Sequence, residues 1–335
     1  MRRFFLWVVL SLCATMPAAA SAAPGCSDVP HADHPSARLS NGDVDALVFL
    51  PDPQKGYYRA MRFDWAGVIP CLSYKGHRYW GEWFSKYDPL IADAITGPVE
   101  EFRSNDGGLD YGVAKPGDLF VKIGVGTLRK IDDSPYKFML DYPLVDAGKW
   151  TVHASKRSIR FEQRLQSPIG YAYVYTKTLR LDKHGAVLAL EHELKNVGTK
   201  TIETDVYDHD FFMLDGKPTG PGMKVKFAFT PRMDPAPDAS LAKISGNELA
   251  YLQEVQPHQT VAGDITGYSN KVSDYDITVE DSTSGVGVEQ TADSPIAKFY
   301  LWSIPTTISP EAYIHLSIPS GKSQRWVIRY RFFAQ

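Results

Sequence analysis

The chain has 335 residues, 44% of them hydrophobic, and a formal net charge of −3 at pH 7. This length can bury a large core, either as two domains of roughly 150 residues or as one all-β domain, because such folds often exceed about 200 residues. A mildly acidic chain without blocks of lysine or arginine argues against nucleic acid as a partner.

The first 22 residues have the features of a secretory signal peptide. Arg2 and Arg3 precede an apolar run over residues 4–13, and small residues follow up to Ala22. The run is shorter than the roughly 20 apolar residues that a membrane helix needs, and no later stretch approaches that length. We therefore expect cleavage near Ala22, a periplasmic or secreted mature chain, and no membrane insertion after the signal is removed.

Cys13 leaves with the signal peptide, so Cys26 and Cys71 are the cysteines of the mature chain. In an oxidising compartment such a pair can form one disulfide bridge. The sequence leaves open whether the two residues come within bonding distance.

Residues 23–45 lack periodicity and predict an extended N-terminal leader, followed by a single domain over residues 46–335. Alternating and β-branched runs separated by turn residues predict many strands and no amphipathic helix. The simplest arrangement is an all-β fold, a large antiparallel β-sandwich. The stretch 231–245 is rich in Pro, Asp and Ala and predicts a surface excursion. The expected strands are 46–50, 57–65, 68–74, 77–83, 150–153, 158–166, 171–181, 187–195, 201–207, 248–255, 275–280, 286–290, 298–303 and 324–333.

Residues 87–135 interrupt this pattern with a segment dense in Gly, Pro, Asp and Asn. Long irregular segments inside a domain are usually functional or disordered, and the apolar residues interspersed here favour an ordered one. Its charged groups, Glu100, Glu101, Arg103 and Lys122, are of the kind that hydrogen-bond sugar hydroxyls. The alternative is that they are ordinary surface charges.

His209 stands between Asp208 and Asp210 at the end of a predicted strand, in the run Thr-Asp-Val-Tyr-Asp-His-Asp-Phe-Phe-Met-Leu-Asp-Gly over 204–216. An imidazole close to aromatic residues that exclude water can exchange a proton near neutral pH. The alternative is a hydrogen-bonded core histidine.

Glu311 follows Pro310 in an apolar and hydroxylic stretch without a neighbouring Lys or Arg. Partial burial would raise the pKa of its carboxyl group toward the range of a general base. The alternative is a surface carboxylate at the end of a strand.

These two stretches together resemble the galactose mutarotases, or aldose 1-epimerases. The run from Asp208 to Gly216 is similar to their signature Asn-His-x-Tyr-Phe-Asn-Leu-x-Gly. Trp302, the sequence Ser-Pro-Glu ending at Glu311, and the Pro-Ser-Gly turn over 319–321 are similar to their C-terminal block. The two landmarks lie in the family's order and about a hundred residues apart, and the resemblance extends over most of the mature chain.

The chain also departs from the family. Asp208 replaces the asparagine before the histidine, and neither the Gly-Arg-x-x-Asn-Arg-Ile motif nor the upstream histidine is found. The segment 97–126 occupies their place, with Arg103 and Lys122 as candidate substitutes. These departures indicate a divergent exported branch.

The resemblance implies a concave sheet that binds a sugar, free or at the end of an oligosaccharide, between Glu311 as catalytic base and protonated His209 as catalytic acid. Ring opening, rotation about C1 and closure would exchange the anomers without a metal or other cofactor. Asp208 or Asp210 would orient the imidazole, and aromatic side chains would stack on the sugar unless they are core residues. The expected substrate-binding residues are Asp208, Arg103, Lys122, Glu101, Trp302, Tyr207 and Trp80.

Other functions stay open on the same fold, namely a carbohydrate-binding protein without catalysis and a glycan lyase or hydrolase. A metal site built from Asp205, Asp208, His209 and Asp210 is disfavoured, because successive strand residues point to opposite faces.

Overall fold

The computed structural model describes residues 25–104 and 106–335, so the signal peptide predicted over 1–22 lies outside the described residues. The regular elements are antiparallel β-strands, and within the described residues the helical elements are two 3-10 turns, η1 (Leu214–Gly216) and η2 (Val272–Asp274). No helix in this part of the chain has the length and apolar character needed to cross a membrane. The predicted all-β, antiparallel fold class is confirmed.

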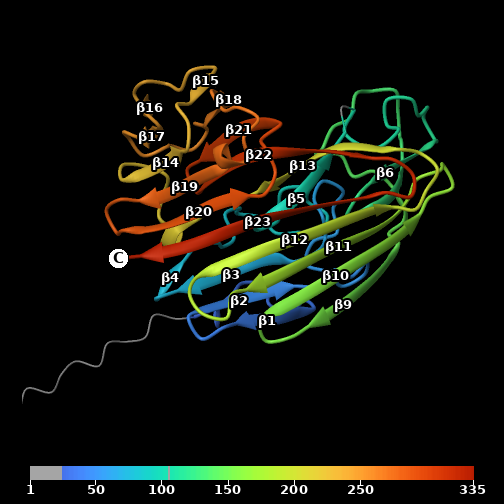
Figure 1. Ribbon diagram of the computed structural model, residues 1–335, viewed down its shortest axis with the longest axis horizontal. Coiled ribbons are helices and arrows are strands. Elements are labelled where there is room, and N and C mark those ends of the chain that lie inside the picture. The colour runs from blue at the N-terminus through green and yellow to red at the C-terminus, as the bar shows by residue number, and fades with distance from the viewer. Residues whose placement is uncertain (1–24, 105) are drawn as a thin grey trace, which may run out of the picture.

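A ten-stranded sheet forms one layer of the molecule, and its long strands β9 to β12 and β23 lie side by side in Figure 1. Strand β10 shows why this sheet forms, since its buried and exposed residues alternate and its buried face is apolar apart from Gln163. In spatial order the strands are β16 (Ala242–Ser245), β17 (Glu248–Tyr251), β14 (Met223–Phe227), β19 (Asp276–Asp281), β20 (Val286–Ala292), β23 (Ser323–Ala334), β12 (Val187–Asn196), β11 (Ala172–Leu181), β10 (Ser158–Gln166) and β9 (Lys149–Ala154).

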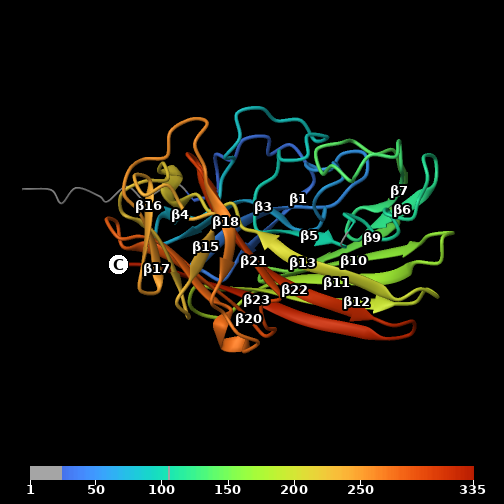
Figure 2. The same ribbon diagram turned by 90° about the horizontal axis from the view of Figure 1, so that it is seen from above.

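Two further sheets cover the inner face of the ten-stranded sheet. Figure 2 shows β5, β13, β21 and β22 between strands of that sheet and the loops of the N-terminal part. The six-stranded sheet has the order β15 (Arg232–Asp234), β18 (Val261–Thr266), β21 (Lys298–Ile304), β22 (Thr307–Ile318), β13 (Ile202–His209) and β5 (Val99–Arg103). The four-stranded sheet consists of β1 (Ser36–Ser40), β2 (Val44–Phe49), β3 (Val68–Tyr74) and β4 (His77–Arg78).

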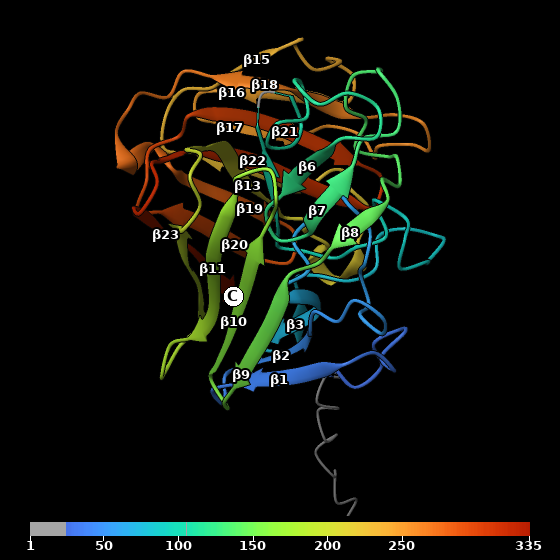
Figure 3. The ribbon, with the colours of Figure 1, turned by 90° about the vertical axis from the view of Figure 1, so that its right-hand side faces the viewer.

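A small three-stranded sheet stands at one end of the molecule, in the foreground of Figure 3. It contains β6 (Leu119–Lys122), β7 (Gly126–Arg129) and β8 (Leu144–Asp146).

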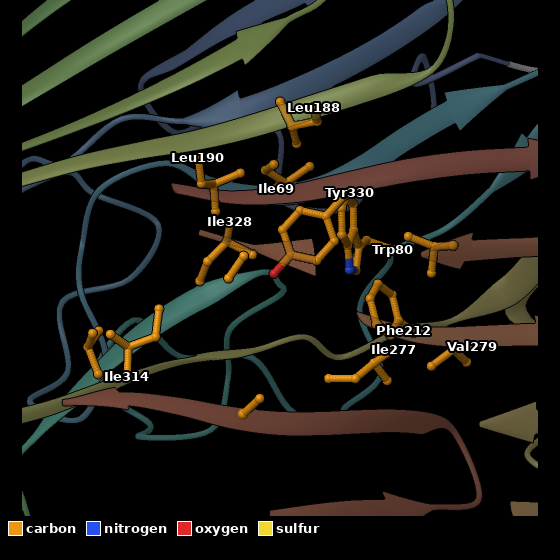
Figure 4. Close-up of a cluster of buried hydrophobic side chains, with 14 of the residues drawn as sticks. Ile69, Trp80, Leu188, Leu190, Phe212, Ile277, Val279, Ile314, Ile328 and Tyr330 are labelled. Carbon is orange, nitrogen blue, oxygen red and sulfur yellow. The ribbon is translucent and has the colours of Figure 1, made fainter. Parts of the chain in front are cut away.

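The core lies between the ten-stranded sheet and the two sheets that cover it. Figure 4 shows residues of all three sheets together, with Leu188 and Ile328 from the ten-stranded sheet, Ile69 from the four-stranded sheet and Ile314 from the six-stranded sheet. Apolar burial of this extent is the main favourable contribution to folding.

Several sequence predictions of secondary structure were wrong. Residues 57–65 form no strand; their aromatic side chains are buried, but their backbone groups bond to separate segments, as when Asp64 N donates to Glu100 O at 2.8 Å. The expected strand 77–83 is reduced to β4. Residues 87–135 contain β5, β6 and β7, and residues 231–245 contain β15 and β16, which occupy sheet edges.

The segment expected as an extended leader contributes β1, which pairs with β2 from Ser36↔Phe49 to Ser40↔Asp45. Cys26, in the same segment, is joined to Cys71 of β3 by a disulfide bond. The bridge ties the start of the described chain to the four-stranded sheet.

We predict that replacing Cys26 and Cys71 together by serine lowers the free energy of unfolding by about 2–5 kcal/mol, because the bridge closes a long loop in the unfolded chain. Denaturant unfolding of the oxidised protein and the double variant would measure the difference. The reduced protein serves as the control and should match the variant. Equal stability of all three would contradict a stabilising role.

Candidate functional site

The site is built where two neighbouring strands separate. Strands β13 and β22 pair from Ile202↔Ile318 to Val206↔Ile314, and backbone pairing resumes at the bridge Phe212↔Ile308. Pro310 lies in the open interval, where its missing N–H costs no ladder hydrogen bond. Glu311, the next residue, lies inside the long strand β22 and not at a strand end.

His209 and Glu311 face each other across this opening, with Nε2 of the imidazole 3.3 Å from Oε1 of the carboxyl group. The side chain of His209 is 4% exposed and that of Glu311 is 7% exposed. The two candidate catalytic residues, about a hundred positions apart in the chain, are thus brought into direct contact.

Aromatic rings hold the imidazole in place. The ring of Phe211 stacks on His209 with centroids 3.7 Å apart, and Trp83 stacks on the other side of Phe211 at 4.9 Å. The backbone of Phe211 has a φ of 47°, a region that a bulky residue rarely adopts and that signals local strain at a functional position. Trp302 meets the imidazole edge-on at 5.2 Å.

A cavity of about 340 Å³ opens above this pair. One face of the six-stranded sheet forms its floor, because alternate residues of β13, β21 and β22 point the same way. Loop residues from the N-terminal half and from the segment after β7 close it. The lining residues are Arg62, Trp83, Asp93, Arg103, Phe138, Tyr207, His209, Phe211, Lys298, Tyr300, Trp302, Glu311 and Tyr313.

Arg62 organises one wall of the cavity. Its Nε donates to Glu101 Oε2 at 2.9 Å and its Nη2 to the Tyr207 hydroxyl at 3.3 Å, while Nη1 pairs with Asp93. The Tyr207 hydroxyl in turn donates to Glu101 Oε2 at 2.6 Å. These contacts fix the wall before any ligand arrives.

Burial sets the protonation of the pair. It raises the pKa of Glu311 to about 8, against the opposing effect of Arg62. Burial, followed by the charge of Arg62, lowers the pKa of His209 well below its usual range. At neutral pH the pair therefore holds one exchangeable proton, on Glu311, whereas the resemblance implied a protonated His209.

The structure places three of the expected substrate-binding residues in the cavity lining: Tyr207, Arg103 and Trp302. Glu101 lies fully buried beneath it, holding Arg62 and Tyr207. Lys122 does not reach the cavity, because its Nζ donates to the carbonyl oxygens of Phe102 and Gly107 at 2.8 and 3.3 Å.

The assignment of Asp208 and Trp80 to the sugar-binding surface was wrong. Asp208 projects to the opposite face of β13 from His209, and its Oδ2 accepts from the Tyr330 hydroxyl at 2.6 Å inside the core. Trp80 packs against Tyr330 in the core, as Figure 4 shows, and its Nε1 donates to the carbonyl oxygen of Asp210 at 2.7 Å.

Neither aspartate orients the imidazole. Asp210 Oδ1 lies 2.7 Å from the Tyr330 hydroxyl on the core side. Among the described residues, His209 Nδ1 has no hydrogen-bond partner, so stacking on Phe211 holds the ring.

A layer of buried charges lies behind the floor. Glu100 of β5 accepts from Lys177 Nζ and lies 2.7 Å from His192 Nε2, and all three side chains are fully buried. Burial, with Glu100 as the next cause, raises the pKa of Asp208 to about 8. Glu100 and Glu101 thus belong to two different networks, one on each face of β5.

The four residues considered for a metal site are not assembled. Asp205 Oδ1 lies 2.8 Å from His315 Nδ1 at the surface, whereas Asp208 and Asp210 face the core and His209 faces the cavity. Within residues 25–104 and 106–335, no group of three or more His, Cys, Asp or Glu side chains could hold a metal ion.

Several cavity residues were missed by the sequence analysis. Arg62 lies in a stretch predicted as a strand, and its only signal was a cation next to Phe63 in an aromatic run. Lys298, Tyr300 and Tyr313 belong to strands beside Trp302 and Glu311, so alternation along these strands was the signal that would have found them.

No protein family and no curated protein matches the chain. Solved structures do match it. A galactose mutarotase-like protein from Clostridium acetobutylicum is 14% identical with a TM-score of 0.55, covering 89% of this chain and 95% of that one. Another from Lactobacillus casei is 12% identical with a TM-score of 0.53, covering 89% and 100%, and an aldose epimerase homologue from Caenorhabditis elegans is 11% identical with a TM-score of 0.53, covering 89% and 98%. The chain therefore has the galactose mutarotase-like fold, as the sequence resemblance implied.

We predict that Asp208→Asn changes the pH dependence of stability and leaves ligand binding in the cavity intact. With a folded-state pKa of about 8, Asp208 keeps a proton that the unfolded chain loses near pH 4, so stability falls as pH rises between these values, by at most about 1.4 kcal/mol per unit. The variant should show a shallower fall in denaturant unfolding between pH 5 and 8. If the variant binds sugar more weakly than the unmodified protein and is equally stable, Asp208 is a ligand-binding residue and this prediction is wrong.

Proposed function

We propose that this protein is a sugar epimerase of the aldose 1-epimerase type, in which His209 and Glu311 exchange the anomers of a saccharide bound in the cavity. The observation that carries the proposal is the buried 3.3 Å contact between His209 Nε2 and Glu311 Oε1 at the floor of an aromatic-walled cavity. The galactose mutarotase-like fold supports it.

The chemistry requires one group that accepts the proton of the anomeric hydroxyl and one that donates a proton to the ring oxygen. The His209–Glu311 pair supplies both functions with its one exchangeable proton. Transfer across the 3.3 Å contact moves that proton from Glu311 to His209 and yields the base and acid that the sugar needs. After ring opening, rotation about C1 and the reverse transfers close the ring as the other anomer.

The rest of the cavity binds and positions the sugar. Tyr300 and Tyr313 offer hydroxyl groups, Trp302 and Trp83 offer aromatic faces, and Arg62 is held rigidly by Glu101 and Asp93. A small number of fixed polar groups among aromatic surfaces is typical of small-molecule sites. A free sugar or the end of an oligosaccharide would fit this description.

We further propose that the protein acts in the periplasm or outside the cell. The signal peptide predicted from residues 1–22 supports this location, and so does the disulfide between Cys26 and Cys71, since such bonds persist mainly in oxidising compartments.

The direct test is NMR saturation transfer between the α and β anomers of a panel of aldoses. We expect accelerated exchange with the mature protein, and a loss of kcat of about 10²–10⁴-fold in Glu311→Gln and His209→Asn, because each removes one half of the acid–base pair. Glu203→Gln, an exposed carboxylate outside the cavity, is the control and should retain full activity. Sugar binding without exchange would favour a carbohydrate-binding protein, and release of reducing ends or unsaturated products from a glycan would favour a lyase or hydrolase.

The pH profile of exchange provides a second test. Activity should fall above about pH 8, where Glu311 loses the proton of the pair, and should fall again at acidic pH, well below 6.5, where His209 gains a second one. Polarimetry from pH 4 to 10 would measure both limbs. A rate that continues to rise above pH 9 would contradict a one-proton pair.

A further inference from the structure

The charges around the cavity are unevenly matched. Arg62 is fully engaged, since Asp93, Glu101 and the Tyr207 hydroxyl bind its three nitrogens. Its guanidinium also lies between the rings of Phe63 and Phe138, 4.4 and 4.2 Å from their centroids, with the side chain 11% exposed. Each nitrogen of Arg62 therefore already has a partner, and two carboxylates share its charge.

Arg103 is much less engaged. Its Nε lies 3.7 Å from Glu101 Oε1, and Glu101 already binds Arg62 at 2.9 Å and lies 3.7 Å from Lys122 Nζ. One carboxylate thus faces three cations. The Arg103 side chain is 41% exposed and lines the cavity, so its donors are accessible to a ligand.

Lys298 is the second accessible cation of the lining. Its ion pair with Asp264 is long, at 3.9 Å, and both side chains are more than half exposed, so the pairing is weak. Lys298 lies opposite Tyr313 in the pairing of β21 and β22, with Nζ 5.4 Å from the centre of the Tyr313 ring.

Arg103 and Lys298 act on the same part of the cavity. Both positive charges reach Glu311 and oppose the rise in its pKa that burial causes. Arg103 also interacts with the Tyr313 hydroxyl. In the ladder of β21 and β22, Lys298 pairs with Tyr313 and Tyr300 pairs with Glu311, so both available cations lie on the Tyr313 side of the reacting pair. Asp93, the other carboxylate of the lining, is held by Arg62.

We infer that the saccharide bound here carries an anionic substituent, a carboxylate or a phosphate, held by Arg103 and Lys298. The inference rests on the proposed function for the position of the sugar's reacting end between His209 and Glu311. In a pyranose the substituent on the carbon next to the ring oxygen lies close to the anomeric centre, so a hexuronate or a hexose 6-phosphate would bring its charge toward this pair of cations. The guanidinium fork of Arg103 suits either group.

The test measures binding apart from catalysis. Calorimetric titration of the Glu311→Gln variant, whose amide replaces a neutral carboxyl group, would use D-galactose, D-galacturonate and D-galactose 6-phosphate, and the three corresponding D-glucose compounds. We expect at least one anionic sugar to bind about tenfold or more tightly than its neutral counterpart, with the preference weakening as salt rises. Comparison of uronate with phosphate ester identifies the anion.

Variants then assign the preference to residues. Arg103→Gln and Lys298→Gln, each made in the Glu311→Gln protein, should reduce binding of the anionic sugar by about tenfold and leave binding of the neutral sugar nearly unchanged. Lys226→Gln is the matched control, because Lys226 is also a strand lysine with a carboxylate partner, Glu280, and lies outside the cavity lining. The control should retain the full preference.

Each outcome has a definite meaning. Equal binding of neutral and anionic sugars, or a preference that survives both substitutions, overturns the inference. The inference is also overturned if the two variants change the pH profile of exchange but not this preference. The cations would then only shift the pKa of Glu311. Anionic sugar binding without anomer exchange by the unmodified protein supports the inference and overturns the proposed function. Binding of no sugar overturns both.

Discussion

The candidate site depends on a local break in one β-ladder. Strands β13 and β22 stop pairing after Val206↔Ile314 and meet again at Phe212↔Ile308. Continuous pairing would place a regular row of backbone hydrogen bonds across this interval. The opening instead lets Phe211 adopt its unusual backbone conformation and stack on His209, and it accommodates Pro310 next to Glu311.

Successive side chains of β5 and β13 point to opposite faces of the sheet. Polar residues that are neighbours in the sequence therefore belong to two separate networks. Tyr207 and His209 line the cavity and Glu101 lies beneath them on the same side, while Glu100 and Asp208 face the core. Buried charges are tolerated only when they are paired or neutralised, and both systems meet this condition. In the core Lys177 pairs with Glu100, and under the cavity Arg62 pairs with Glu101.

Pre-organisation follows from this arrangement. The wall made by Arg62 is fixed by ionic hydrogen bonds, and His209 is fixed by stacked rings, so a ligand has few side chains to order on binding. Arg103 and Lys298, at the exposed edge, are less tightly held. Rigidity around the reacting pair combined with accessible charge at the edge is suited to selecting a ligand by its substituent.

The sequence by itself determined the fold class, through alternation in stretches such as β10, and the two halves of the site, through the residues around His209 and Glu311. It did not place Arg62, because a backbone that bonds to several distant segments leaves no periodic pattern. It also misplaced Trp80 and Lys122, because residue type shows that a group is aromatic or charged but not what it packs against. Asp208 was misplaced although alternation from His209 puts it on the opposite face of β13. Only the tertiary structure decides which distant segments meet. It therefore decides the packing partners of these side chains, the disulfide between Cys26 and Cys71, and the 3.3 Å contact of His209 with Glu311.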